Sequence, residues 1–423
     1  MLQIQAIREN QEFIIERLKI KNFDARALVE KIINIDVEIR NYKKLLDDNL
    51  MEQNRCSKEI GILFKEGKAT EAQTLKNSIA ALKVAEKNYQ NLLTEKEEVL
   101  DSTLVLLPNL PHSSVPVGKG ADDNEIVYSE GDTNYSEEMV PHWDLVKKYD
   151  IIDFELGNKI TGAGFPVYKG KGAKIQRALI SFFLDSAVEA GYLEIQPPYM
   201  VNEDSAYATG QLPDKEGQMY HATLDNLYLI PTAEVPVTNI YRNVILKENA
   251  FPIKMCAYSA CFRREAGSYG KDVRGLNRLH QFDKVEIVQI AHPSNSYELL
   301  EEMKTHSISL IQKLGLPFRV LRLCGGDMSF TSALTYDLEV YAKAQQKWLE
   351  VSSVSNFEIY QANRMKLRFK DETGKSQIAH TLNGSALALP RILAAILENY
   401  QTQKGIIVPE VLRKYTGFDM ISL

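Results

Sequence analysis

The sequence contains few cysteines, and they do not form the pattern of a metal site. The four cysteines are Cys56, Cys256, Cys261 and Cys324, and the intervals between them do not match the spacing of zinc ligands. Cys256 and Cys261 lie inside one apolar, strand-like stretch. We therefore expect buried, reduced thiols in a cytosolic protein, rather than a zinc site or a disulfide-bonded secreted fold.

Long hydrophobic segments are also lacking. No apolar run in the 423 residues approaches the length that a membrane-spanning helix needs. The first ten residues, MLQIQAIREN, show no cationic segment followed by an apolar one, which excludes a typical secretion signal. With 44 % hydrophobic residues, the chain has the composition of a soluble globular protein of two or three domains. We expect a cytoplasmic protein without a membrane partner.

The common nucleotide-binding loops are missing as well. The sequence has no G-x-x-x-x-G-K-[ST] phosphate loop and no G-x-G-x-x-G after a strand. Its seven histidines show no catalytic cluster. A nucleotide would therefore be held by side chains on a sheet rather than by backbone amides at the start of a helix. The net charge of −6 argues mildly against nucleic-acid binding, which would need a local basic strip.

What the sequence does contain is a series of five short motifs in its C-terminal part. They are PTAE at 231–234, FRREAG at 262–267, HQFDKVE at 280–286, EVSSVSN at 350–356 and TLNGSALALPR at 381–391. Arginine suits phosphate and carboxylate binding because its planar guanidinium forms paired hydrogen bonds and stays protonated. Arg263, Arg278 and Arg391 lie inside or beside these motifs. Glu286 and Glu350 supply carboxylates for a substrate ammonium and a magnesium ion. The set predicts a site that joins an amino acid to ATP.

The N-terminal part has the periodicity of a long helical hairpin, from about residue 27 to residue 104. Apolar residues recur there in alternating steps of three and four, which is the seam of a coiled coil. Between two such seams, KEGKA at 65–69 is polar and contains glycine, which favours a tight turn and antiparallel pairing within one chain. Asn49, Gln53 and Glu86 occupy seam positions, where polar residues fix the register at some cost in stability. Taken alone, such a hairpin is most often a spacer or an oligomerisation device.

The remainder of the chain has the pattern of a mixed fold. Pro108, Pro111 and Pro116 mark a linker into it. Strand-like runs at 227–230, 253–259, 284–290, 318–323 and 336–341 alternate with helical segments at 174–190, 296–314 and 390–402. This pattern predicts the α+β class, with a mixed, largely antiparallel sheet flanked by helices.

Together the motifs resemble those of class II aminoacyl-tRNA synthetases, and specifically the seryl-tRNA synthetases of the bacterial type. The likeness covers nearly the whole chain, including LLPNLPHSSVPVG at 106–118 and SYGKDVRGLNRLHQF at 268–282. The chain departs from the family pattern at Gly164, where arginine is usual, and at Val354, where cysteine is frequent. The departures do not affect a residue that we assign to substrate.

The resemblance implies a fold, an activity and partners. It implies the class II synthetase fold, and the activation of L-serine with ATP and Mg²⁺ to seryl-adenylate. The seryl group would then pass to the 3′ end of tRNA(Ser), and of tRNA(Sec) if the host has one. Residues 1–105 would form a tRNA-binding domain with the hairpin as its arm, and 106–423 the catalytic domain. The resemblance also implies a homodimer joined near residues 174–201.

It further implies roles for individual residues. Serine would be bound by Thr232, Ala233, Glu234, Arg263, Glu286, Asn383 and Ser385. ATP would be bound by Arg263, Arg264, Glu265, Arg278, Leu279, Phe282, Glu350, Val351, Ser352, Ser353 and Arg391. Arg263 and Arg391 would act as the catalytic residues, and Glu350 and Ser353 as the magnesium ligands.

Two alternatives to a seryl-tRNA ligase stay open at this stage. The first is a synthetase-like enzyme that loads a small amino acid onto a carrier protein, but such enzymes lack the full hairpin. The second is a non-catalytic RNA-binding or scaffold protein derived from a synthetase. Such a protein should have lost ATP-binding residues, whereas Arg263, Glu265, Glu350 and Arg391 are all present. ATP–pyrophosphate exchange with each amino acid, followed by charging of total tRNA, separates the three.

Overall fold

The structure is a computed structural model that describes residues 1–214, 216–265 and 274–423. The last two residues of the FRREAG motif and the first six of the 268–282 stretch lie outside the described residues. The chain divides into two compact units. The first comprises Met1–Lys19 and Phe23–Pro108, and the second comprises Ile20–Asn22 and Asn109–Leu423.

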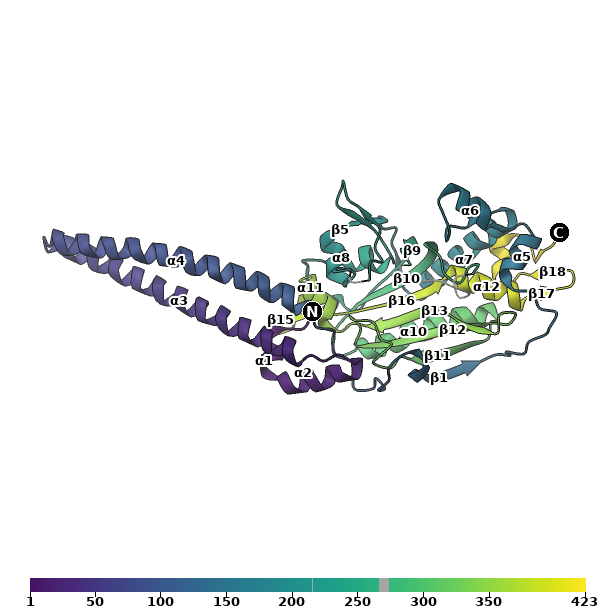
Figure 1. Cartoon of the computed structure of the whole chain (residues 1–423), viewed down its shortest axis with the longest axis horizontal. Helices are drawn as coiled ribbons and strands as arrows, with labels where there is room; N and C mark the ends of the chain where they lie inside the picture. The colour runs from purple at the N-terminus through teal and green to yellow at the C-terminus, as the bar shows by residue number, and fades with distance from the viewer. Residues whose placement is uncertain (215, 266–273) are drawn as a thin grey trace. The chain divides into compact units, whose positions relative to one another are not determined.

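The first unit contains two short helices and the predicted hairpin. Helices α1 (Ile4–Glu9) and α2 (Gln11–Leu18) precede the long helices α3 (Arg26–Lys65) and α4 (Ala69–Leu104). Figure 1 shows α3 and α4 side by side along their whole length. Gly67 makes the turn between them at φ +76°, a conformation that glycine adopts without steric cost. The hairpin prediction is confirmed, within one residue at its start.

Polar contacts at the seam fix how α3 and α4 pair. Gln53 Nε2 donates to Asn49 Oδ1 at 2.7 Å and to Glu86 Oε2 of the facing helix at 2.8 Å. Nearer the base of the hairpin, the Lys43–Glu97 ion pair spans the two helices at 2.8 Å. A slip of one turn would separate these partners, so the three seam residues specify the register, as polar seam residues do in coiled coils.

The second unit is built on an eight-stranded sheet. Its order is β1 (Glu125–Glu130), β11 (Phe318–Arg322), β12 (Leu334–Ala342), β13 (Lys347–Asn356), β16 (His380–Ala388), β10 (Gln281–Ala291), β9 (Ile253–Phe262) and β4 (Leu193–Glu194). All neighbouring pairs are antiparallel except β4 with β9, which is parallel. The prediction of a mixed, mainly antiparallel sheet in an α+β fold is confirmed.

Three long helices cover one face of this sheet, and the site occupies part of the other, beside α9 (Glu234–Asn239) and α11 (Ile359–Arg364). Helices α7 (Gly170–Glu189), α10 (Ser296–Leu314) and α12 (Leu389–Asn399) pack on the sheet within one apolar core (Figure 1). Val285 and Ile287 of β10 are fully buried in that core. Glu286 lies between them, so the alternation of a strand directs its side chain to the opposite face.

Of the three helices predicted in this unit, the one at 296–314 has the limits of α10, whereas α7 begins four residues before the predicted start at 174. The segment predicted as helical at 390–402 ends at Asn399, because Gln401–Thr402 form β17, which pairs with β18 (Gly405–Ile407). Strands β13 and β16 were not predicted as strands, although they carry two of the five motifs.

Smaller elements complete the second unit. The helices are α5 (His142–Lys148), α6 (Phe154–Ile160), α8 (Glu203–Thr209), α9 (Glu234–Asn239), α11 (Ile359–Arg364) and α13 (Glu410–Thr416). The strands are β2 (Ile152–Asp153), β3 (Val167–Tyr168), β5 (Met200–Asn202), β6 (His221–Ala222), β7 (Leu227–Leu229), β8 (Ile245–Lys247), β14 (Arg368–Lys370), β15 (Ser376–Ile378) and β19 (Met420–Ile421). The four cysteines are free and buried, as predicted. None of the helices within the described ranges is long and apolar enough to cross a membrane.

Candidate active site

A cavity of about 440 Å³ lies on the sheet face opposite the helical core. Its size is within the usual range of small-molecule sites. The predicted residues that line it are Thr232, Glu234, Arg263, Glu265, Arg278, Leu279, Phe282, Glu286, Glu350, Val351, Ser352, Ser353, Asn383, Ser385 and Arg391. Residues from four of the five motifs thus meet on β10, β13, β16 and α9, and those of the FRREAG motif directly follow β9.

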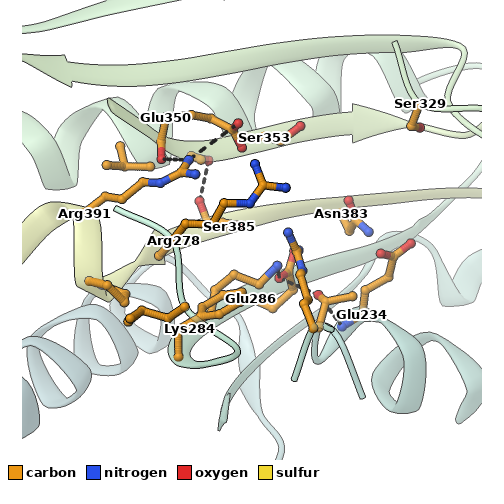
Figure 2. A pocket seen from close by; sticks show the side chains of 18 of the residues that line it. Glu234, Arg278, Lys284, Glu286, Ser329, Glu350, Ser353, Asn383, Ser385 and Arg391 are labelled. Atoms are coloured by element: carbon orange, nitrogen blue, oxygen red, sulfur yellow. Dashed lines mark hydrogen bonds and ion pairs between the residues drawn. The ribbon is translucent and has the colours of Figure 1, made fainter. Parts of the chain in front are cut away.

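A buried carboxylate forms the centre of one side of the cavity. Glu286 is only 2 % exposed, and its Oε2 accepts a hydrogen bond from Thr232 Oγ1 at 2.9 Å. Lys284 Nζ forms an ion pair with the same oxygen at 2.5 Å (Figure 2). A buried carboxylate is costly without a partner, and here a cation and a hydroxyl group compensate for the lost hydration.

A second buried carboxylate, Glu234, lies on the same side of the cavity (Figure 2). Its Oε1 accepts a hydrogen bond from Gln361 Nε2 at 2.6 Å. Burial and the nearby charge of Glu286 raise the pKa of Glu234 to about 7, although Gln361, Lys284 and Asn383 act in the opposite direction. Two acidic groups facing one cavity make a pocket suited to a cationic group such as an ammonium ion.

Strand register brings the polar residues of the motifs together. Glu286 on β10 lies directly opposite Ser385 on β16, and Asn383 on β16 lies opposite Ser355 on β13. Directly opposed residues on neighbouring strands place their side chains on the same face. The sheet therefore presents carboxylate, hydroxyl and amide groups side by side across three strands.

Arginines dominate the other side of the cavity. Arg391 Nη1 donates to the backbone oxygen of Glu350 at 2.7 Å and lies 3.7 Å from Glu350 Oε2 (Figure 2). Arg278 forms an ion pair with Glu265. The guanidinium of Arg263 lies 5.2 Å from the centroid of the Phe282 ring, within the range of a cation–π contact. This side has the positive charge and the aromatic face that a nucleotide needs.

Oxygen ligands suited to a hard cation lie next to Arg391. Glu350 and Ser353 are on β13, and Asp337 on β12 is the strand partner of Ser353. Burial and the charge of Glu350 raise the pKa of Asp337 well above its usual value. Within the ranges that the structure describes, no three His, Cys, Asp or Glu side chains form a metal cluster. The Glu350–Ser353 pair fits Mg²⁺, which binds through one or two carboxylates and completes its shell with water and phosphate oxygens.

Two of the predicted residues are not among the described residues that line the cavity. Ala233 is fully buried and precedes α9, between Thr232 and Glu234. The backbone amide of Arg264 donates to the backbone oxygen of Gln218 at 2.9 Å. Both are neighbours of cavity residues in the chain, but neither lines the cavity itself.

The structure also places in the cavity residues to which the sequence assigned no role, some of them inside the motifs. Lys284 is the most informative, because it forms the ion pair with Glu286. Its position two residues before Glu286 on a strand was a usable signal, since alternate residues share a face. The further lining residues are Gln211, Leu276, Asn277, Ser329, Thr331, Ser355, Phe357, Ala388 and Pro390.

Gly164, where the family usually has arginine, contacts His280 from the motif at 280–286. Its φ is +83°, and a Cβ atom there would lie 2.3 Å from the ring of His280. The ring of His280 also stacks on Phe165, and its Nδ1 lies 2.8 Å from the hydroxyl oxygen of Tyr220. His280 thus has a structural environment.

Comparison with known proteins identifies the family. Residues 1–111 match the model of the seryl-tRNA synthetase N-terminal domain, and residues 219–400 match the tRNA synthetase class II core domain (G, H, P, S and T). The chain is 47 % identical to a serine–tRNA ligase of Salinibacter ruber, over 100 % of this chain and 99 % of the relative. The chain belongs to the seryl-tRNA synthetase family. The family prediction from the motifs is confirmed.

Further seryl-tRNA synthetases agree in sequence and in fold. A serine–tRNA ligase of Chlorobaculum parvum is 46 % identical over the full length of both chains. The crystal structure of a seryl-tRNA synthetase from Pyrococcus horikoshii, complexed with ATP, superimposes with a TM-score of 0.95 at 33 % identity, over 100 % of this chain and 99 % of that one. Because the N-terminal model matches through the hairpin, the carrier-protein alternative is not favoured.

Proposed function

We propose that this protein activates L-serine with ATP and transfers the seryl group to tRNA(Ser), and to tRNA(Sec) where one exists. The observation that carries the proposal is the division of the cavity into two sides. One side has two buried carboxylates and hydroxyl groups, and the other has three arginines and an aromatic ring. The amino acid fits the side with the carboxylates, and the nucleotide fits the side with the arginines. In this arrangement the serine carboxylate lies beside the α-phosphate.

On the serine side, Glu286 takes the ammonium and the hydroxyl group, with help from Thr232 and Ser385. The support is the 2.9 Å contact between Thr232 and Glu286 and the strand pairing of Glu286 with Ser385. Glu234 adds a second acceptor for the ammonium, and Asn383 is placed for the serine carboxylate. A site that binds the hydroxyl group rejects alanine strongly, because its polar groups are then left without partners.

On the ATP side, Phe282 stacks on the adenine and Glu265 accepts a hydrogen bond from its amino group. Arg263 binds the α-phosphate and the serine carboxylate, and Arg391 covers the adenine and reaches the γ-phosphate. Arg278 is paired with Glu265 in this structure, so nucleotide binding would exchange partners there. Arginine forks aimed at the phosphates lower the barrier by stabilising the charge that develops during transfer.

The reaction needs no general base in its first step. The serine carboxylate is already an anion, and its oxygen attacks the α-phosphorus while the bond to the leaving pyrophosphate breaks. Arg263 and Arg391 orient the two reactants and balance the growing negative charge. A magnesium ion held by Glu350 and Ser353 would neutralise phosphate charge. In the second step a ribose hydroxyl at the 3′ end of tRNA attacks the seryl carbonyl, and AMP leaves.

We also propose that residues 1–105 form the tRNA-binding domain and residues 106–423 the catalytic domain. A hairpin of 40 and 36 helical residues spans about 55 to 60 Å at a rise of 1.5 Å per residue. That length exceeds the needs of a small-molecule site and suits a partner of the size of tRNA. A cytoplasmic location is part of the proposal, and a relative from Naegleria fowleri is itself described as cytoplasmic.

Two linked assays test this function. Serine should support ATP–pyrophosphate exchange well above the level given by alanine, glycine or threonine, and total tRNA should then accept labelled serine. A carrier-loading enzyme would give the exchange without charging tRNA. A non-catalytic scaffold would give neither activity.

The raised pKa of Glu234 predicts a pH dependence for serine binding. Ionised Glu234 attracts the serine ammonium, and with a pKa of about 7 the carboxyl group becomes protonated as the pH falls below that value. The KM for serine should therefore rise between pH 8 and pH 6, approaching tenfold per pH unit at the acid end. Steady-state exchange at saturating ATP measures it. Glu234→Gln, with a fixed neutral side chain, should show a high and nearly pH-independent KM.

We propose a homodimer joined through the α7–β4 region. β4 is a two-residue strand at the edge of the sheet, and Leu193 in it is 64 % exposed. Val188 and Met200 are further exposed apolar residues in the same stretch of sequence. Sedimentation at micromolar concentration should give twice the chain mass of 47.9 kDa, and Leu193→Glu should shift it towards the monomer. A fully active monomer would rule out this part of the proposal.

A further inference from the structure

His142, at the start of α5, forms a buried pair with Glu398 of α12. Both side chains are fully buried, and His142 Nδ1 lies 2.8 Å from Glu398 Oε1. The backbone amide of His142 donates to the same oxygen at 3.0 Å. Neither residue lines the cavity, but His142 bonds a residue that does, and Glu398 reaches another through Gln345.

The bonds of the imidazole assign its proton. The backbone amide of Leu276, a cavity residue, donates to His142 Nε2 at 2.9 Å. Nε2 is therefore the acceptor nitrogen, and Nδ1 carries the proton that it donates to Glu398. The neutral ring thus connects a carboxylate on α12 to the chain segment at the edge of the cavity.

The approach of this segment to the ring requires a glycine. Gly275 has φ +68°, and a Cβ atom there would lie 2.3 Å from His142 Nε2. Arg274 adds a second attachment to α5, because its guanidinium lies 4.7 Å from the Trp143 ring and 3.9 Å from Asp144. The segment from 274 to 276 is thus held against α5 at several points.

A second branch runs from Glu398 to Arg391. Gln345 Nε2 donates to Glu398 Oε1 at 2.8 Å, and Asn277 Nδ2 donates to Gln345 Oε1 at 2.7 Å. Arg391 Nε in turn donates to the backbone oxygen of Asn277 at 3.0 Å. Since Arg391 and Glu398 are on the same helix, these bonds close a ring through α12, Gln345 and Asn277.

We propose that His142 and Glu398 are positioning residues for the ATP side of the site. They fix the backbone of residues 275–277, and the carbonyl oxygen of Asn277 in turn orients Arg391. The inference rests on the proposed role of Arg391 in ATP binding. The described hydrogen bonds of the pair lead to this segment, to Gln345 and to α12, whereas the serine pocket is built on β10, β16 and α9. A loss of the pair should therefore affect ATP and spare serine.

Two substitutions of His142 separate its two bonds. His142→Gln places an amide oxygen near the position of Nε2, so it can still accept from Leu276. His142→Asn places an amide nitrogen near Nδ1, so it keeps the bond to Glu398 and loses the one to Leu276. We expect both variants to raise the KM for ATP in pyrophosphate exchange, with the KM for serine within twofold. The rise should be about tenfold or more in His142→Asn, which loses the direct bond to Leu276, and smaller in His142→Gln, which loses the bond to Glu398.

The control for the substitution itself is His306→Gln. His306 is a partly buried histidine on α10 outside this network, and its substitution should leave both KM values unchanged. Gln345→Leu breaks the second branch at a partly exposed position and should reproduce the ATP-specific defect if a His142 variant does not fold.

Selective ¹⁵N-histidine spectra should show one ring with the proton on Nδ1, and this signal should be lost in the His142 variants.

Arg391→Ala tests the underlying assignment separately. If it leaves the KM for ATP unchanged, the proposed role of Arg391 is wrong. If Arg391→Ala raises that KM but His142→Asn and Gln345→Leu do not, the positioning role is overturned. The positioning role is also overturned if these two variants raise the KM values for serine and ATP equally, because the pair would then serve only the stability of the fold.

Discussion

Replacing Glu286 with alanine is expected to lower serine-dependent ATP–pyrophosphate exchange by about a thousandfold or more. The carboxylate is 2 % exposed and is the partner of Lys284 and Thr232. Its removal leaves the Lys284 ammonium uncompensated in the pocket, where it would repel the ammonium of serine. The variant thus loses an attraction and gains a repulsion at the same position.

The double variant Glu286→Ala, Lys284→Met separates these two effects. It removes the uncompensated charge, so it should recover part of the exchange activity but not the preference for serine over alanine. Thermal unfolding of both variants shows whether the loss reflects folding. Near-wild-type exchange in the single variant would mean that the serine pocket lies elsewhere.

Shortening the hairpin is expected to separate the two steps of the reaction. A variant that joins Leu46 to Leu93 through a short Gly-Ser turn removes residues 47–92 and keeps the base of the hairpin, including the Lys43–Glu97 ion pair. Serine activation should stay within about twofold of the wild type, whereas the rate of tRNA charging should fall by at least about a hundredfold, on the order of the loss of several phosphate contacts. Exchange and charging assays on the same preparation measure the rates of the two steps.

A hairpin rebuilt to full length provides the matched control. It keeps the seam residues between 47 and 92 and replaces the surface lysines and arginines there with glutamine. If length alone matters, this protein charges tRNA normally. If the surface binds the RNA, it fails as the short form does, and charging by the wild type falls steeply with added salt while exchange changes little. Normal charging by the short form would falsify the assignment of the hairpin as an RNA-binding arm.

The hairpin was predictable because each of its determinants is local. The seam follows a fixed period, and KEGKA at 65–69 interrupts it where α3 ends and α4 begins. The seam positions of Gln53 and Glu86 placed them on the facing sides of the two helices, where the structure has their 2.8 Å contact. Long helices with one apolar stripe depend little on distant parts of the chain.

Strands β13 and β16 were not predicted for the opposite reason. EVSSVSN and TLNGSALA are rich in serine, asparagine and small residues, which are poor signals for a strand. These two segments become strands because they pair with β12 and β10, which are distant in the sequence or not identifiable as partners from it. The motifs therefore predicted which groups these segments supply to the site, but not that the segments are strands.

The site shows the same division between local and distant information. The sequence predicted a substrate ammonium as the partner of Glu286, and the structure adds a cation of the protein itself, Lys284 on the same strand. Gln361, which holds Glu234, lies 127 positions away in the chain. The contact of Leu276 with His142 spans 134 positions. Such pairs come together only through the tertiary fold, and a single sequence contains no period or spacing that identifies them.

The alternation of side chains along β10 also limits how this protein can evolve. Glu286 points into the cavity while Val285 and Ile287 point into the helical core. Substitution of one residue alters one side chain, but deletion of one residue would reverse the faces of all that follow in the strand. Valine would then enter the substrate pocket and glutamate the apolar core. The turns between strands can change in length without this effect, and the neighbouring inner strands β13 and β16 accommodate an extra residue only as a local bulge.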